Sequence, residues 1–146
     1  MGQQDYILRM IEQLGRMLAA LRARILGGES DARTVQERLR EAGRTGGVDL
    51  EIARAMTTDT LVMMLSPAGE LEPGRAWLMA ELLYLDGLDA HLAGETERAD
   101  ASLQRALVLY RLIGPQTLKL VALPEAGDRI AEIERLLDSD PPPEAA

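Results

Sequence analysis

The stretch QDYILRMIEQLGRMLAALRARIL, residues 4–26, carries the clearest helical pattern in this chain. Its main apolar side chains alternate between spacings of four and three residues, and they are Ile7, Ile11, Leu14, Leu18, Leu21 and Ile25. This spacing places them on one face of an α-helix. Leu8, Met10 and Met17 make that face broader than a two-stranded coiled coil needs. The stretch therefore predicts a helix that packs among several others.

Further helices are predicted wherever apolar residues recur at helical spacing between turn-forming residues. The first helix ends at Gly27-Gly28, a loop is expected at 44–47, and the later helices are predicted at 31–42, 49–55, 57–65, 72–93, 95–113 and from Pro124 onward. The apolar residues are mainly Leu, Ala, Ile and Met, with no Phe, and these favour helices over strands. We therefore expect an all-α fold, a compact helical bundle of about five to seven helices in one domain over residues 1–138. The acidic, proline-rich tail, 139–146, is predicted to be disordered.

The composition argues against several kinds of chemistry. The chain has no cysteine, which excludes disulfides, thiolate zinc sites and cysteine nucleophiles. His91 is the only histidine, and neither Gly27-Gly28 nor Gly46-Gly47 is followed by the Lys-Ser/Thr of a phosphate loop. The carboxylates are distributed along the chain, and no pair of them stands out. We therefore expect a protein that is not an enzyme and that binds no metal and no cofactor.

Charge and hydropathy bear on the partners and the location of the protein. The net charge is −8, because residues 61–146 carry fifteen acidic and seven basic side chains while residues 1–60 carry nine of each. A net acidic surface repels phosphate backbones, so no nucleic-acid partner is expected. The N-terminus does not read as a signal peptide, and no apolar run approaches the roughly 18–20 residues of a spanning helix. These patterns predict a cytoplasmic protein without a membrane partner.

Residues 83–115 resemble a single tetratricopeptide repeat, which is a pair of antiparallel helices. The matching positions are Leu83, Gly87, Gly94, Ala99, Leu103, Ala106 and, a few residues late, Pro115. The small residues Gly87 and Ala99 would let the two helices approach closely. Asp86 and Ala90 depart from the repeat pattern, where an apolar residue and an aromatic residue usually stand. The alternative is an ordinary helical hairpin with small residues at its crossing.

Nearly the whole chain is also similar to a family of uncharacterised bacterial proteins. Members of that family open with a helix that reads much like QDYILRMIEQ, residues 4–13 here. They continue with short acidic and apolar helices and a tetratricopeptide-like hairpin. The resemblance implies a bacterial, all-helical architecture, and it implies no particular activity.

Two kinds of function are compatible with this sequence. The first is a protein-interaction or self-association module, in which the hairpin offers a groove to an apolar helix or peptide. The groove positions would be Glu81, Tyr84, Leu88, His91 and Leu92. The chain's own first helix is an alternative occupant of that groove. The second function is a small-molecule sensor or small enzyme, with a pocket between helices near Trp77, Tyr84 and His91.

A homodimer is the partner that the sequence favours. The first helix presents more apolar side chains than one neighbouring helix usually covers, and large exposed apolar patches on soluble proteins usually mark interfaces. The predicted interface residues are Leu8, Met10, Leu14 and Met17. The alternative is a monomer in which this helix lies wholly inside its own bundle.

Overall fold

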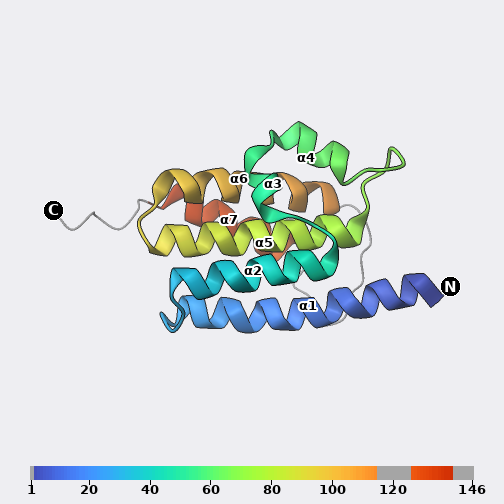
Figure 1. Cartoon of the computed structure of the whole chain (residues 1–146). Coiled ribbons are helices and arrows are strands. Elements are labelled where there is room, and N and C mark those ends of the chain that lie inside the picture. The colour runs from blue at the N-terminus through green and yellow to red at the C-terminus, as the bar shows by residue number, and fades with distance from the viewer. Residues whose placement is uncertain (1, 115–125, 140–146) are drawn as a thin grey trace.

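A computed structural model describes residues 2–114 and 126–139, and every regular element within those ranges is a helix (Figure 1). The helices are α1 (Gly2–Leu26), α2 (Ala32–Gly46), α3 (Leu50–Ala55), α4 (Thr58–Met64), α5 (Pro73–Leu92), α6 (Thr96–Ile113) and α7 (Ala126–Asp138). The predicted all-α bundle is confirmed. Several predictions concern parts outside the described residues, namely the side chain of Ile7, Pro115, the stretch 118–123, Pro124 and the tail from 140 to 146.

The helix α5 forms the centre of the bundle. Every residue from Ala76 to Leu88 is buried, so this helix has neighbours on all sides. Figure 1 shows α1 and α2 side by side along one flank of α5, with α6 running antiparallel to α5 on another. The helix α7 packs mainly against α6, and the short helices α3 and α4 lie along the outer edge of the bundle. Burial on all sides explains why α5 is the most apolar helix of the chain.

Side-chain caps start the short helices where the sequence predicts them. The Asp49 carboxylate accepts hydrogen bonds from the backbone N–H groups of Glu51 and Ile52 at the start of α3. The Thr57 hydroxyl accepts one from the backbone N–H of Thr60 at the start of α4. Each bond satisfies a backbone donor that the first turn of a helix leaves free.

The helix α2 extends beyond its predicted end at Ala42, and the expected loop at 44–47 is therefore wrong for its first three residues. The glycines inside this last turn permit close packing against the centre of the bundle. A Cβ atom on Gly46 would lie 2.0 Å from Cδ2 of Leu78, on α5. The chain leaves the helix only at Gly47, whose φ of +76° a residue with a side chain rarely adopts.

The close crossing predicted between α5 and α6 is present. A Cβ atom on Gly87 would lie 2.6 Å from Cγ of Leu103 and 3.3 Å from the carbonyl oxygen of Ala99. Gly94 has a φ of +78° in the turn between the two helices. An ordinary helical hairpin can cross in the same way, so the tetratricopeptide assignment stays a prediction.

The apolar seam of α1 is covered inside its own bundle. The members whose side chains are described are all buried, and they are Ile11, Leu14, Leu18, Leu21 and Ile25. They pack into one continuous core with side chains of the other helices. Among the described helices, no stretch combines the length and the apolar character that crossing a bilayer requires.

Candidate docking site

The groove predicted along α5 is occupied by two helices of the chain itself. Of the five predicted groove residues, Glu81, Tyr84 and Leu88 are buried, His91 is half-buried and Leu92 is exposed. From α7, Arg129 donates a hydrogen bond from Nε to Oε1 of Glu81 at 2.7 Å. The Arg129 guanidinium also lies 4.6 Å from the centre of the Tyr84 ring, a cation–π distance. The buried part of the predicted groove is therefore already filled.

The helix α1 closes the same face of α5. From α1, Arg22 donates from Nε to the Tyr84 hydroxyl at 2.7 Å, and its guanidinium also pairs with Glu132 of α7. Burial alone would raise the pKa of Glu132, but hydrogen bonds with Tyr84 and Arg22 hold it below its usual value. The first helix, proposed as an occupant of the groove, therefore contacts Tyr84 through Arg22, and α7 contacts the same ring through Arg129. Glu81 is covered by α7, which the sequence did not indicate.

The three residues of the alternative pocket differ in their surroundings. Trp77 and Tyr84 are buried in the core, and Tyr84 is engaged by Arg22. The ring of His91 lies 3.4 Å from the Ser139 hydroxyl. Neither of the two surface cavities described below is lined by any of the three.

The predicted dimer residues on α1 differ in their exposure. Leu14 is buried in the core of its own chain, so it is not available for contact with a partner. Leu8, Met10 and Met17 are half-buried. Met10 lines a cleft of about 150 Å³ beside Arg75. The seam itself is therefore buried within its own chain, while the three residues that widen it remain partly accessible, and the dimer interface stays a prediction.

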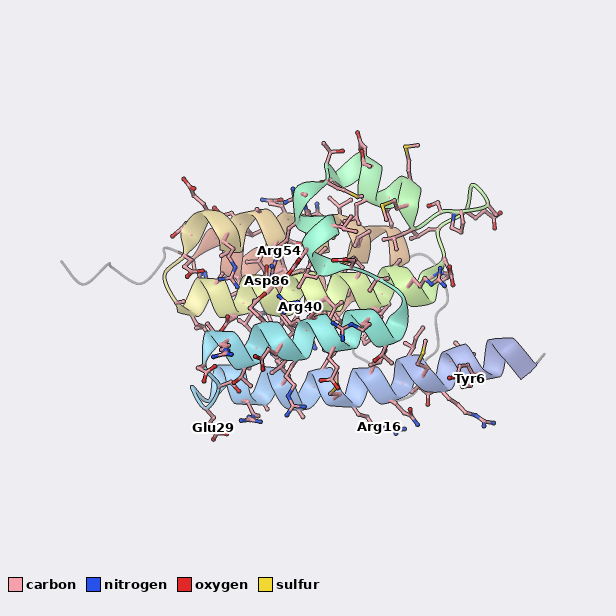
Figure 2. All side chains as sticks on the ribbon, viewed as in Figure 1. Tyr6, Arg16, Glu29, Arg40, Arg54 and Asp86 are labelled. Atoms are coloured by element: carbon pink, nitrogen blue, oxygen red, sulfur yellow. The ribbon has the colours of Figure 1, made fainter. Side chains whose placement is uncertain are left out.

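A buried carboxylate, that of Asp86, ties four helices together. It lies in the middle of α5 with no exposed surface (Figure 2). Its hydrogen-bond donors come from α2, α3 and α6, and they are Gln36, Arg54, Arg98 and Ser102. Burial alone would raise the pKa of Asp86, but these hydrogen bonds hold it below its ordinary value. The side chain is therefore a negative charge at neutral pH, with its partners directed at it.

Two arginines hold α3 and α4 against the bundle. Arg54 of α3 donates from Nε to Oδ2 of Asp86 at 3.1 Å. Arg105 of α6 donates from Nε and Nη2 to the carbonyl oxygen of Met56, at 3.1 Å and 2.8 Å, just where α3 ends. Leu50 and Leu61 anchor the inner faces of the two helices in the core. These contacts decide which face of α3 and α4 points outward.

That outward face carries an apolar groove. A cavity of about 340 Å³ opens between α3, α4 and the start of α5, and it is lined by Gly47, Val48, Asp49, Ile52, Ala53, Met56, Leu61, Met64, Leu65, Arg75 and Met79. Ile52 is 45% exposed, Met64 55%, and the neighbouring Met63 74%. Among the residues whose burial is described, the other exposed large apolar side chains lie on other helices, and they are Tyr6, Leu26, Leu92 and Leu112. Clustered exposure of this kind marks interaction sites, whereas scattered exposure is ordinary.

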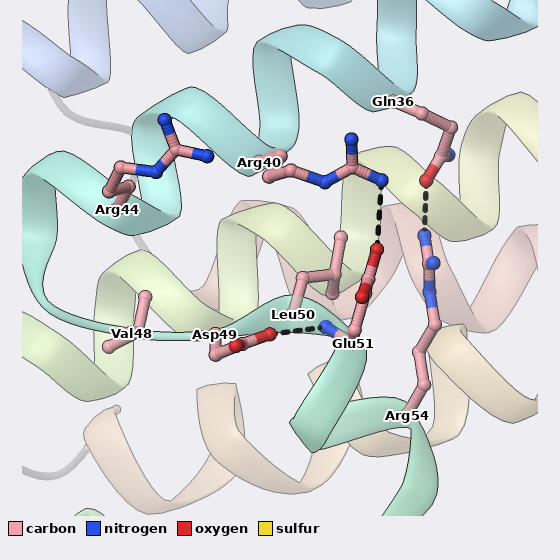
Figure 3. Close-up of a pocket in the computed structure, with 8 residues that line it drawn as sticks. All are labelled: Gln36, Arg40, Arg44, Val48, Asp49, Leu50, Glu51 and Arg54. Carbon is pink, nitrogen blue, oxygen red and sulfur yellow. Dashed lines mark hydrogen bonds and ion pairs between the residues drawn. The ribbon is translucent and has the colours of Figure 1, made fainter.

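An arginine-lined cleft adjoins this groove (Figure 3). It has a volume of about 200 Å³ and is lined by Gln36, Arg40, Arg44, Val48, Asp49, Leu50, Glu51 and Arg54. Nη2 of Arg40 lies 2.8 Å from Oε1 of the exposed Glu51. Arg44, one turn further along α2, forms no ion pair within the described part of the chain. Since the cleft and the groove share Val48 and Asp49, they form one surface around the loop between α2 and α3.

This surface was missed from the sequence, although one signal for it exists. Residues 61–65 read LVMML, five consecutive apolar residues in a short helix and its cap. One side of a helix cannot bury five consecutive residues, so some of them must face outward. Two do, Met63 and Met64. Asp86 stood out only as a departure from the repeat pattern, with no indication that it binds partners on three other helices.

The site has to be interpreted from its own geometry. No protein-family model matches the chain, and neither the curated proteins nor the solved structures contain a significant match to it. Within the described residues, no group of three or more His, Cys, Asp or Glu side chains is arranged to hold a metal ion. The feature that distinguishes this surface is exposed apolar area beside arginines.

Proposed function

We propose that this domain is a non-enzymatic protein-interaction module. Its docking surface would be the groove between α3, α4 and the start of α5, together with the adjoining arginine cleft. The observation that carries the proposal is the exposure of Ile52 and Met64, which line a cavity of about 340 Å³, together with that of the adjacent Met63. Methionine side chains are flexible and polarisable, which suits a surface that must adapt to a partner.

The shape and the charge of the surface indicate the kind of partner. A groove lined by aliphatic side chains suits the apolar face of a short helix. Its charged rim includes Arg75, whose side chain is half exposed, and Arg44 stands in the neighbouring cleft. An acidic side chain next to the apolar face of the partner would meet these guanidinium groups. The proposed partner is therefore an amphipathic helix with at least one carboxylate.

The docking surface can be tested by affinity purification with matched variants. Tagged wild-type protein would be compared with Ile52→Glu and Met63→Glu, which place a charge in or beside the groove. Leu92→Glu is the control, since Leu92 is 50% exposed and lies at the far end of α5. Each variant should keep the wild-type melting temperature, because exposed positions tolerate substitution.

We expect wild type and Leu92→Glu to recover the same partner, whether a second, differently tagged copy or another protein. Ile52→Glu and Met63→Glu should recover about tenfold less of it, as the loss of a central apolar contact predicts. Equal recovery by all four proteins would place the docking surface elsewhere and overturn the proposal.

A further inference from the structure

We infer that the partner helix is α4 of a second copy of this chain, so that two copies pair through reciprocal docking of α4. This inference rests on the proposed function and names its partner. Its first support is the composition of α4, which reads TDTLVMM and carries a single charge, Asp59. Asp59 precedes Met63 by four residues, so both side chains lie on one face of the helix. This helix therefore offers the combination that the groove requires, an exposed apolar side chain and one carboxylate.

The second support is the charge at the rim of the groove. The side chain of Arg75 is half exposed, and its ion pair with Glu72 spans 3.6 Å between Nη1 and Oε2. That separation is longer than a charge-assisted hydrogen bond, so the guanidinium has donors left for another carboxylate. Asp59 of a second copy is the acidic residue that arrives with Met63. The groove is lined by Asp49 as well as Arg75, so the complementarity proposed here is that of one pair, Arg75 of one copy and Asp59 of the other.

The third support is the position of the groove beside the helix that would fill it. Met64 lines the cavity, and Met63 precedes it on α4, so the helix that borders the groove also carries the exposed side chain that would dock. A two-fold axis next to α4 can then place each α4 over the groove of the other copy. In such a contact each groove is occupied by α4 of the other copy, so no groove remains for a third copy and the assembly is a closed dimer. It also removes Met63, the most exposed of these side chains, from water in both copies.

Sedimentation equilibrium of the purified chain at about 1–100 µM tests the inference. Wild type is expected as a species of twice the 16.0 kDa chain mass at the upper concentrations. Met63→Glu and Ile52→Glu should raise the dissociation constant at least about tenfold, whereas Leu92→Glu and Leu112→Glu should leave it unchanged. A wild-type chain that is monomeric throughout, or a dimer unaffected by Met63→Glu and Ile52→Glu, overturns the inference.

A charge exchange tests the proposed pairing directly. Asp59→Arg and Arg75→Asp should each weaken the dimer about tenfold, because each places like charges together. The double variant should return the dissociation constant to within about threefold of wild type, since the pair is restored with its signs reversed. A double variant as weak as the single ones overturns the docking of α4.

These outcomes are separable from those for the proposed function. If the chain is monomeric but another protein is captured through Ile52 and Met63, the proposed function stands, and the inference that the partner is a second copy is wrong. If capture does not depend on those residues, the function itself fails.

Discussion

The Asp86 carboxylate and the Arg54 guanidinium connect the centre of the bundle to the arginine cleft of the proposed docking surface. Asp86 has no exposed surface, whereas the side chain of Arg54 is 30% exposed and lines the arginine cleft (Figure 2). Nε of Arg54 lies 3.1 Å from Oδ2 of Asp86. Because Asp86 also binds Arg98 and Ser102 of α6, one buried charge positions α3 relative to α6.

Asp86→Asn should destabilise the fold while leaving its shape unchanged. The substitution removes the charge that Arg54 and Arg98 face, and an amide cannot accept from every donor around it. We expect a loss of about 1–3 kcal/mol in the free energy of unfolding, measured by urea denaturation. Asp100→Asn on the exposed side of α6 is the control and should stay within about 0.5 kcal/mol of wild type. Equal midpoints for both variants would show that the buried charge contributes nothing.

The stability of the wild-type protein should fall in acid. The pKa of Asp86 is lower in the folded protein than in the unfolded chain, where the pKa of an aspartate is about 3.9. The unfolded chain therefore takes up this proton first, so the stabilisation is complete above that pH and is lost as the pH falls below it. Urea unfolding between about pH 7 and pH 2 measures the loss. In Asp86→Asn the free energy of unfolding should fall less steeply with decreasing pH, because only the contribution of Glu132 and other carboxylates remains. An unchanged pH dependence would contradict the lowered pKa of Asp86.

Gly87→Leu should strongly destabilise the domain. Even a Cβ atom at this position would lie 2.6 Å from Leu103 Cγ, and a branched side chain needs still more space. Such overpacking costs about 1–3 kcal/mol or more, seen as a lower thermal midpoint. Gly127→Ala in α7 is the contrasting case, because nothing lies within 4 Å of its Cβ position. Because Gly127 is in the first turn of α7, that change should leave the thermal midpoint unchanged or raise it slightly, by less than about 0.5 kcal/mol in stability. Similar midpoints for the two variants would contradict the close crossing.

Substitution of Glu81 alone should lower the free energy of unfolding more than substitution of both Glu81 and its ion-pair partner Arg129. Glu81→Leu leaves the buried guanidinium of Arg129 with only Glu132, at 3.4 Å, as a carboxylate partner, and a loss of up to about 3–5 kcal/mol is expected. In the double variant Glu81→Leu/Arg129→Met neither charge of this pair remains, so part of the loss should be recovered, although the buried Tyr110 hydroxyl still lacks Glu81 as its acceptor. A double-mutant cycle by urea unfolding measures the coupling between the two residues. Additive losses would show that the ion pair is not what fastens α7 to α5.

Arg105→Met should loosen the docking surface more than the bundle. Arg105 donates two hydrogen bonds to the Met56 carbonyl between α3 and α4, and methionine can make neither. Hydrogen exchange should become faster for amides of α3 and α4, while global stability changes by about 1 kcal/mol. Arg111→Met is the control, since Arg111 forms an exposed ion pair with Glu134. If exchange in α3 and α4 is the same in both variants, another contact holds these helices.

Local patterns in the sequence were sufficient to predict the helices. The spacing of apolar residues in α1, the caps Asp49 and Thr57, and the turn at Gly94 all act within a few neighbouring residues. Such features depend on backbone geometry and on hydrogen bonds along one segment, so they can be read without knowing the fold. The close crossing at Gly87 was predictable for a similar reason, since small residues stood at the contact positions of a two-helix unit. The end of α2 was not, because the sequence does not show that Gly46, which leaves no room for a side chain beside Leu78, lies inside the helix and not in a loop.

What the sequence by itself determined is an all-helical chain, most of its helix boundaries apart from the end of α2, and its seam of core residues. Only the tertiary structure decided which apolar faces are covered. The seam of α1 lies inside the monomer, α7 occupies the groove beside Glu81, and Met63 is left outside. The hydrophobic effect is non-directional, so an apolar side chain gains from burial against any apolar partner. Periodicity therefore shows which face of a helix favours burial, but not which other helix covers it. That choice depends on contacts between residues far apart in the chain, such as Glu81 with Arg129 and Asp86 with Arg54.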